Sequence, residues 1–297
     1  MQYDKRPLSF DAQADLLIDR GLVADKSLLI TRLKSVNYYR LSGYLYPYRV
    51  LPGDNFKPGT SFDLVWQHYA FDRRLRVILM DAIERIEVSV RTLLIYHLAH
   101  QTGPFGYTDP ASLPKLLPAQ HAKLMERIAG DTRESQEVFV EHFFSKYGDK
   151  HEHLPLWMAA EIMSFGRVLT MYRGVPPSIK RAMARHYMIP DEVLTSWLVS
   201  LNAIRNVCAH HGRLWNRELG YKTKLPSANK NPEWHHPVTI RNNRVFIILT
   251  IAQHFLKIIA PQSGWKNRLY TLLDAYPEIS RPSMGFPANW KECPIWQ

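Results

Sequence analysis

The densest polar cluster of the chain spans residues 205–217 and reads Arg-Asn-Val-Cys-Ala-His-His-Gly-Arg-Leu-Trp-Asn-Arg. Within it, Arg205 and His210 form an Arg-x4-His pair. A histidine can transfer the proton of an RNA 2′-hydroxyl, a step that contributes about 10² to 10⁴ in rate, and an arginine can stabilise the charge that develops on the phosphate. Such a pair, without a cluster of carboxylates, suits cleavage of RNA by its own 2′-hydroxyl.

The Arg-x4-His spacing alone is weak evidence, because the chain contains a second pair, Arg181 and His186, in a basic segment typical of a solvated helix face. The context of the first pair sets it apart. Asn206 lies four residues before His210, so on a helix its amide can orient the imidazole. His211 follows His210 directly, and the next residue is a glycine, which is common at the C-terminal end of a helix.

Arg205 falls on the apolar side of the helix predicted over residues 190–211. At 100° per residue it lies within about 40° of Leu201, which belongs to the apolar stripe. An unpaired buried guanidinium costs several kcal/mol, so Arg205 requires an anionic partner or a function. Arg205 and His210 lie about 140° apart around an ideal helix. They can therefore cooperate only if the last turn distorts or if the partner residue comes from a second copy.

The charge of the chain points to a polyanionic partner. It has 38 Lys and Arg against 27 Asp and Glu, a net charge of +11 and a pI near 9.6. This balance favours nucleic acid over a merely basic surface. In the aromatic and basic run at residues 37–49, tyrosines and arginines could stack on and bind RNA, although tyrosines at this density also serve as packing residues. The candidate RNA-binding residues are Tyr38, Tyr39, Arg40, Tyr44 and Arg49.

Metal and nucleotide sites lack their usual spacings. Cys208-x-His210 and His151-x-His153 do not form the paired ligand sets of zinc sites, and no acidic cluster is placed to hold Mg²⁺. A glycine-rich phosphate loop is also missing from the sequence. We therefore expect no metal and no cofactor.

Three features predict a soluble, cytoplasmic protein with no membrane partner. The two cysteines lie far apart in the sequence, which favours a reducing compartment. The start, MQYDKRPLSFDAQ, lacks the pattern of a signal peptide. The longest apolar stretch, residues 245–260, is interrupted by polar side chains and reads as a buried helix.

Hydrophobic periodicity predicts an all-α fold, since almost no segment alternates as a strand would. The longest predicted element runs from about residue 60 to about residue 100, as one helix or two nearly continuous ones. Glu84, Glu87 and Arg91 lie beside its apolar stripe, either as support for the site or as an ion pair. Further helices are predicted over residues 10–21, 26–36, 119–129, 134–147, 155–172, 177–187, 190–211, 243–259 and 265–275.

Two irregular segments organise the chain. The loop at residues 51–60 carries two prolines and two glycines and is the best internal boundary. It separates an N-terminal helical region, residues 1–60, from a main helical domain, residues 61–297. The segment 212–242 is long for a connector and is a candidate wall of the site.

The residues around Arg205 resemble the signature of a known family, the Abi-like proteins of the AbiD and AbiF group, which belong to bacterial abortive infection. Three further blocks match in order, so that the resemblance covers nearly the whole chain: residues 37–44, residues 84–91, and residues 154–158 with 163–166. The matching signature is Arg205-Asn206-x-x-Ala209-His210-His211-x-Arg213-x-Trp215-Asn216.

The resemblance implies a HEPN-type helical bundle in which Arg205 and His210 form a metal-independent RNase site. It implies a homodimer, because in such families two copies usually meet and each gives one Arg and one His to a shared cleft. It also implies phage defence through RNA damage, and some relatives are restrained by a structured noncoding RNA. The residues expected to support the site are Asn206, His211, Arg213, Trp215, Asn216, Glu84, Glu87 and Arg91.

Two functions from different classes follow from the sequence. The favoured one is a metal-independent endoribonuclease, because a pure binding protein would not need Arg205 and His210 together at a helix end. The alternative is a non-catalytic module that binds RNA or another protein, in which a patch of Lys and Arg would dominate affinity.

Overall fold

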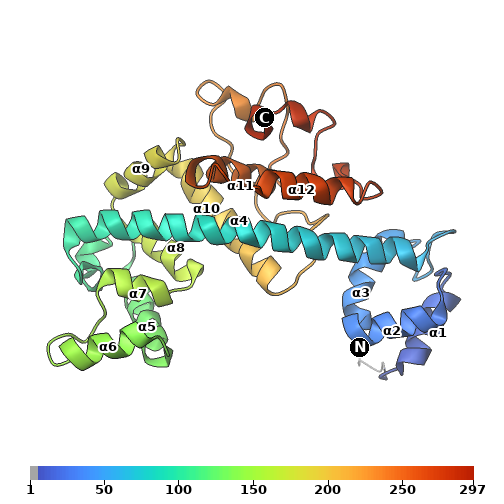
Figure 1. Ribbon diagram of the computed structural model, residues 1–297, viewed down its shortest axis with the longest axis horizontal. Helices are drawn as coiled ribbons and strands as arrows, with labels where there is room; N and C mark the ends of the chain where they lie inside the picture. Colours follow the sequence, from blue (N-terminus) through green and yellow to red (C-terminus); the bar gives the residue numbers. More distant parts are fainter. Residues whose placement is uncertain (1–5) are drawn as a thin grey trace.

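The fold is all-α, as predicted. The computed structural model describes residues 6–297, and over that range it contains twelve α-helices, several single 3₁₀ turns and no β-strand (Figure 1). The helices are α1 Phe10–Asp19, α2 Lys26–Val36, α3 Tyr38–Leu45, α4 Phe62–Thr102, α5 Pro118–Glu134, α6 Val138–Tyr147, α7 Leu156–Ile162, α8 Phe165–Gly174, α9 Pro177–His186, α10 Asp191–Ala209, α11 Val245–Ile259 and α12 Trp265–Asp274.

Helix α4 is the scaffold of the molecule and forms one continuous element of 41 residues. It begins where the Ser61 hydroxyl accepts the backbone N–H of Leu64, and it ends before Gly103, whose φ of +77° suits glycine. At 1.5 Å per residue it is about 60 Å long. A stripe of buried residues runs along it, so most of the other helices pack against one rod.

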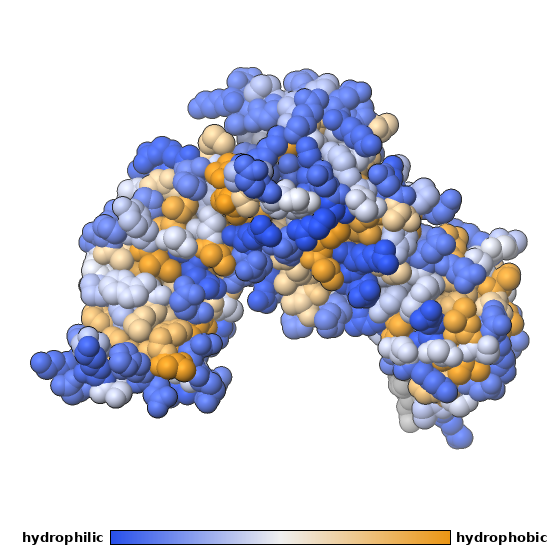
Figure 2. All heavy atoms as spheres, in the orientation of Figure 1, coloured by the Kyte–Doolittle hydropathy of each residue, from blue (hydrophilic) through white to orange (hydrophobic). Residues whose placement is uncertain are grey.

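The remaining helices are distributed along α4 and form an arch (Figure 1). Helices α1 to α3 lie at one end of α4, α5 to α7 lie at the other end, and α10 to α12 pack along its middle. The space-filling view shows the hollow underside of this arch between the two end lobes (Figure 2). The C-terminal end of α10 crosses α4 and reaches this hollow side.

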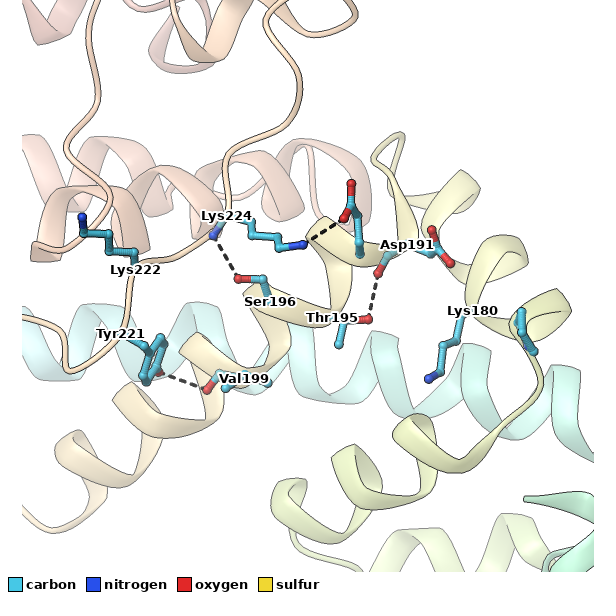
Figure 3. Close-up of a pocket in the computed structure, with 10 residues that line it drawn as sticks. Lys180, Asp191, Thr195, Ser196, Val199, Tyr221, Lys222 and Lys224 are labelled. Carbon is cyan, nitrogen blue, oxygen red and sulfur yellow. Dashed lines mark hydrogen bonds and ion pairs between the residues drawn. The ribbon is translucent and has the colours of Figure 1, made fainter. Parts of the chain in front are cut away.

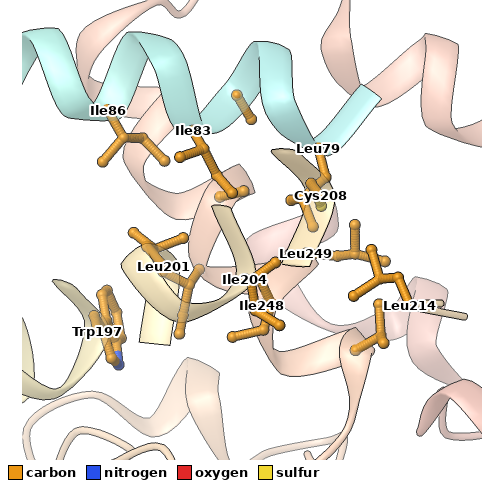
Figure 4. Packing of buried hydrophobic residues seen from close by; sticks show 14 of the residues in the cluster. Leu79, Ile83, Ile86, Trp197, Leu201, Ile204, Cys208, Leu214, Ile248 and Leu249 are labelled. Atoms are coloured by element: carbon orange, nitrogen blue, oxygen red, sulfur yellow. The ribbon is translucent and has the colours of Figure 1, made fainter. Parts of the chain in front are cut away.

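The core lies where α4, α10 and α11 meet. Ile83 of α4, Ile204 of α10 and Ile248 of α11 are buried together there (Figure 4). Helix α11 is apolar on nearly all sides because it is enclosed by α4, α10 and the C-terminal turns. Among the helices of residues 6–297, none combines the length and apolar character that a membrane crossing requires.

Two predicted helix boundaries were wrong. The helix expected over residues 155–172 is broken into α7 and α8, because Met163 and Ser164 have extended backbones and the Met163 carbonyl accepts a hydrogen bond from Arg91. The helix expected from residue 134 begins only at Val138, since α5 continues to Glu134 and an extended link follows it.

The predicted boundary at residues 51–60 coincides with an irregular link between the turn at Tyr46–Tyr48 and α4. Leu41 and Tyr44 of α3 are buried in the same hydrophobic cluster as α4. Residues 1–5 of the predicted N-terminal region lie outside the described residues, and the division into 1–60 and 61–297 stays a prediction.

Replacing Gly174 with alanine is expected to destabilise the protein by about 1–3 kcal/mol, as overpacking does. A Cβ at Gly174 would lie 2.8 Å from Leu116 Cγ and 3.1 Å from Leu113 Cβ, so the segment that packs on the end of α8 must shift. The change is measured by denaturant unfolding. Gly130→Ala is the matched control, because a Cβ in that part of α5 meets nothing within 4 Å and alanine favours helix. Equal midpoints for the two variants would contradict the expected close packing.

Candidate functional site

The predicted signature lies at the C-terminal end of α10. The helix begins after Pro190 with Asp191 and Glu192 in its first turn, where acidic side chains interact favourably with the helix dipole. Its predicted apolar stripe is buried from Leu194 to Cys208. The helix ends at Ala209, so His210 lies in the exposed turn just beyond it.

The turn that contains the two histidines leaves the helix abruptly. His211 has a φ of +57°, and the backbone N–H of Gly212 donates to the Val207 carbonyl over 2.7 Å. The hydrogen bond that joins Asn206 to His210 is made by the backbone, with the His210 N–H donating to the Asn206 carbonyl over 3.0 Å. Both histidine side chains are exposed and available to a ligand.

Arg205 lies close to an anionic side chain, although its Nε forms no hydrogen bond. Its Nε lies 3.9 Å from Glu87 Oε2 on α4, and the carboxylate is held from the other side by Arg91, whose Nη2 donates to Oε1 over 3.0 Å. Burial raises the pKa of the Glu87 carboxyl, while the two guanidinium groups lower it. The Arg205 side chain remains 35% exposed, so part of its guanidinium can bind an anion from solution.

Arg91 links three elements around this pair. Besides Glu87 it donates to the Met163 carbonyl over 3.1 Å, and its Nη1 lies 3.7 Å from Glu161 Oε2 at the end of α7. The structure therefore brings Glu87 and Arg91 to Arg205, as the sequence allowed. Glu84 is exposed and lines a shallow hollow with residues of α9 and α11.

A buried carboxylate that the sequence analysis missed holds the segment after α10. Asp72 of α4 is fully buried and accepts backbone N–H groups of Leu214 and Trp215, the latter over 2.7 Å. It also accepts the Tyr44 hydroxyl over 2.6 Å and Arg76 Nη1 over 2.5 Å. Burial raises the pKa of the Asp72 carboxyl, while these four donors oppose that effect. The sequence carried one signal for it, because Asp72 falls on the buried stripe of α4.

Two further arginines fasten α3 to the histidine turn. Arg40 Nη1 donates to the His211 carbonyl over 2.5 Å, and Arg213 Nη1 donates to the Gly43 carbonyl. Both guanidinium groups thereby join segments about 170 residues apart in the sequence. The aromatic and basic run is thus part of the frame of the site.

The predicted RNA-binding residues differ in accessibility. Tyr44 is 2% exposed and bonded to Asp72, so the prediction that its ring stacks on a base is wrong. Tyr38 is half-buried, and its hydroxyl accepts a hydrogen bond from Arg20. Arg49 forms an ion pair with Asp54 over 2.7 Å. Tyr39 is 85% exposed and keeps a free ring face.

Trp215 and Asn216 of the signature also contribute to the frame. The Trp215 ring is buried against the His68 ring, with centroids 4.8 Å apart. The Asn216 carbonyl accepts a hydrogen bond from Arg244 Nη1 over 3.2 Å. These two residues therefore position the backbone behind the histidine turn.

The irregular segment 212–242 borders the site only through its first residues. Farther on, Trp234 packs against Trp197, with ring centroids 4.8 Å apart, and Trp197 Nε1 donates to the Lys224 carbonyl. Tyr221, Lys222 and Lys224 line a hollow of about 650 Å³ along the first half of α10 (Figure 3). That hollow lies toward the opposite end of the helix from Arg205.

The site offers no set of metal ligands. Among the described residues, no group of three or more His, Cys, Asp or Glu side chains is arranged to hold a metal ion. Burial raises the pKa of the Cys208 thiol to about 12, so this cysteine is an inert packing residue at neutral pH.

A comparison with known families decides the affiliation of the chain. The family described as Abi-like protein matches residues 31–216, from α2 to the end of the signature. The chain belongs to the Abi-like protein family. Membership of the Abi-like proteins suggests a role in abortive infection, and the matched range contains Arg205, His210, Glu87 and Asp72. No curated protein and no solved structure matched this Abi-like protein.

Proposed function

We propose that this Abi-like protein is a metal-independent endoribonuclease that acts in abortive infection against phage. The observation that carries the proposal is the environment of Arg205. The Arg205 guanidinium lies 3.9 Å from the Glu87 carboxylate and remains 35% exposed, and the same helix ends at the exposed His210. A proton carrier and a phosphate-binding cation are thus presented together on a strongly basic protein.

The reaction requires only the RNA and these two side-chain types. His210 takes the proton of a 2′-hydroxyl, the 2′-oxygen attacks the adjacent phosphorus, and the bond to the 5′-oxygen breaks. Arg205 stabilises the negative charge on the phosphate oxygens, and a protonated imidazole returns a proton to the leaving 5′-oxygen. The products are a 2′,3′-cyclic phosphate and a 5′-hydroxyl.

A homodimer with a HEPN-type shared cleft is part of this proposal. In residues 6–297 no hydrogen bond joins the Arg205 guanidinium to the His210 ring, an arrangement compatible with a site completed by a second copy. Asn206, Ala209 and His210 are exposed at the helix end, which leaves room for a second copy. Restraint by a noncoding RNA would act through the same basic surface.

The alternative is a non-catalytic protein that binds RNA or another protein. Its support is that several signature arginines have structural partners: Arg40 and Arg213 are bonded to carbonyls, and Arg205 lies beside Glu87. In that case RNA affinity would depend on Lys and Arg side chains elsewhere and fall steeply with salt.

The experiment that tests the proposal is incubation of mixed cellular RNA with purified protein in EDTA, followed by analysis of the product ends. We expect cleavage that leaves 2′,3′-cyclic phosphates and disappears in Arg205→Ala and His210→Ala. Intact RNA after incubation with wild-type protein stripped of bound RNA would favour the binding protein. Cleavage that EDTA abolishes would overturn the metal-independent mechanism.

A further inference from the structure

A second cationic surface lies outside the candidate site, between α5 and α8 toward the C-terminal end of α4 (Figure 1). It is a hollow of about 370 Å³, which we call the α5–α8 groove. Its cationic lining residues are Lys115, Lys123, Arg127, Arg167 and Arg173. Gln120 and Thr170 add polar groups to the same lining.

The helical repeat explains why these charges converge. On α5, Lys123 and Arg127 are four residues apart and share a face. On α8, Arg167 and Arg173 are six residues apart and both line the groove. The two helices pack through buried residues such as Leu124, so their cationic sides rise on either side of one hollow.

The far end of the groove is fixed by backbone contact. The Lys115 N–H donates to the Gly174 carbonyl over 3.0 Å, at the C-terminal end of α8. This holds Lys115 near Arg173 and near Lys180 of α9. Burial lowers the pKa of the Lys180 ammonium, and the positive charges of Lys115 and Arg173 lower it further, while the Asp191 carboxylate opposes them. Cations are therefore crowded at this end of the groove.

The groove has a large excess of positive charge. Arg167 is paired with Asp131 over 2.7 Å and also donates to the Ser164 hydroxyl. Among the described residues, no carboxylate oxygen lies within 4.0 Å of a side-chain nitrogen of the other four cations. Like charges that face one another are unfavourable unless an anion joins them.

One end of the groove adjoins the candidate site. A Cβ built at Gly166, next to Arg167, would lie 3.8 Å from Asn202 Oδ1 on α10. Asn202 precedes Arg205 by three residues, which is about 4.5 Å along the helix axis. From Arg167 to Arg173 the groove continues for about 9 Å along α8. The N-terminal end of α8, where the groove begins at Arg167, therefore lies beside the helix turn that precedes Arg205.

We propose that the α5–α8 groove binds the phosphate backbone of RNA on one side of the candidate site. The identity of the polyanion as substrate RNA rests on the proposed function, whereas binding itself does not require cleavage. In the groove, RNA phosphates would contact Lys and Arg side chains that have no carboxylate partner. Such contacts depend on the charge of the RNA backbone and not on its base sequence.

The test compares two double variants with the same change in net charge. Lys123→Glu with Arg127→Glu reverses the charge of two residues in the groove. Lys222→Glu with Lys230→Glu reverses the charge of two exposed lysines in the irregular segment. Both are made in a His210→Ala background, so that RNA stays intact. The probe is a single-stranded RNA of about 20 nucleotides, long enough for a site and its flank.

We expect the groove variant to bind this RNA at least about tenfold more weakly at 0.1 M salt, with a slope of log K against log salt smaller by about 0.7 per lost phosphate contact. At the same salt concentration, the control pair should change the affinity for RNA less than about threefold, because salt screens charges that lie far from the bound RNA. Thermal unfolding of both variants verifies that they fold. Equal losses for the two pairs, or no loss for the groove pair, overturn the proposal.

Two further outcomes separate this proposal from its alternatives. Because binding is measured, a protein that binds RNA through the groove but never cleaves it supports the groove and refutes only the nuclease. A protein that cleaves RNA yet binds it equally with and without the groove charges refutes only the groove. Tighter binding of polyglutamate than of RNA with the same number of charges would instead indicate an acidic protein partner.

Discussion

Replacing Arg205 or His210 with alanine is expected to lower the rate of RNA cleavage by about 10² to 10⁴, the usual range for loss of a general acid–base or a charge-stabilising donor. His210→Ala removes the proposed proton carrier. Arg205→Ala removes the guanidinium near Glu87 that is proposed to stabilise the phosphate charge. RNA binding should change little, since most of the basic surface is retained. Cleavage is measured under single-turnover conditions in EDTA, and binding is measured separately.

The chain provides its own control for these variants. Arg181 and His186 on α9 have the same Arg-x4-His spacing, and both are exposed. Arg181→Ala and His186→Ala should therefore cleave RNA at close to the wild-type rate. Comparable losses from the α9 pair, or normal cleavage by Arg205→Ala, would show that the residues at the end of α10 are not the catalytic ones.

The inactive variants also test the shared cleft. Wild-type chains refolded with an excess of His210→Ala chains form mixed dimers. The shared cleft of a mixed dimer contains one intact histidine instead of two. Activity per wild-type chain should then change with the mixing ratio. A constant value would mean that each chain acts alone, and it would remove the homodimer from the proposal.

Periodicity in the sequence was sufficient to predict the helices that present the site. The apolar stripe of α10 identified Leu201 and Ile204 as buried, and it marked Arg205 as a residue in need of an anion. Glu87 is that anion, 118 positions earlier on α4. Local patterns therefore predicted that Arg205 needs an anionic partner or a function, but they did not name the partner, because the approach of Glu87 depends on how α4 and α10 cross.

Contacts distant in sequence explain what the patterns missed. Asp72 binds backbone N–H groups that lie 142 and 143 residues away, and backbone donors leave no trace in side-chain composition. Tyr44 was placed with its neighbours as an RNA contact because composition does not tell which ring of an aromatic run turns inward. The break between α7 and α8 likewise depends on the bond from Arg91 to Met163.

Replacing Asp72 with alanine is expected to destabilise the fold by about 3–5 kcal/mol, as removal of one partner from a buried ion pair does. The change removes the acceptor of the Tyr44 hydroxyl and of the backbone N–H groups of Leu214 and Trp215. It leaves the Arg76 guanidinium only its longer bonds, to the Tyr44 hydroxyl and the Gly212 carbonyl, each over 3.3 Å. Each of these donors is buried or nearly so, and an unsatisfied buried donor costs about 1–3 kcal/mol. Denaturant unfolding measures the loss.

Asp54 provides the matched control, because it also bonds two arginines, Arg20 and Arg49, but its side chain is 54% exposed. Water can replace a lost partner there, so Asp54→Ala should cost less than about 1 kcal/mol. A similar cost for both variants would mean that Asp72 does not act as a buried acceptor. Because Asp72 bonds the backbone just after His210 and His211, its loss should also expose residues 212–216 to proteolysis before global unfolding. The segment that follows the two histidines and the stability of the fold thus depend on the same carboxylate.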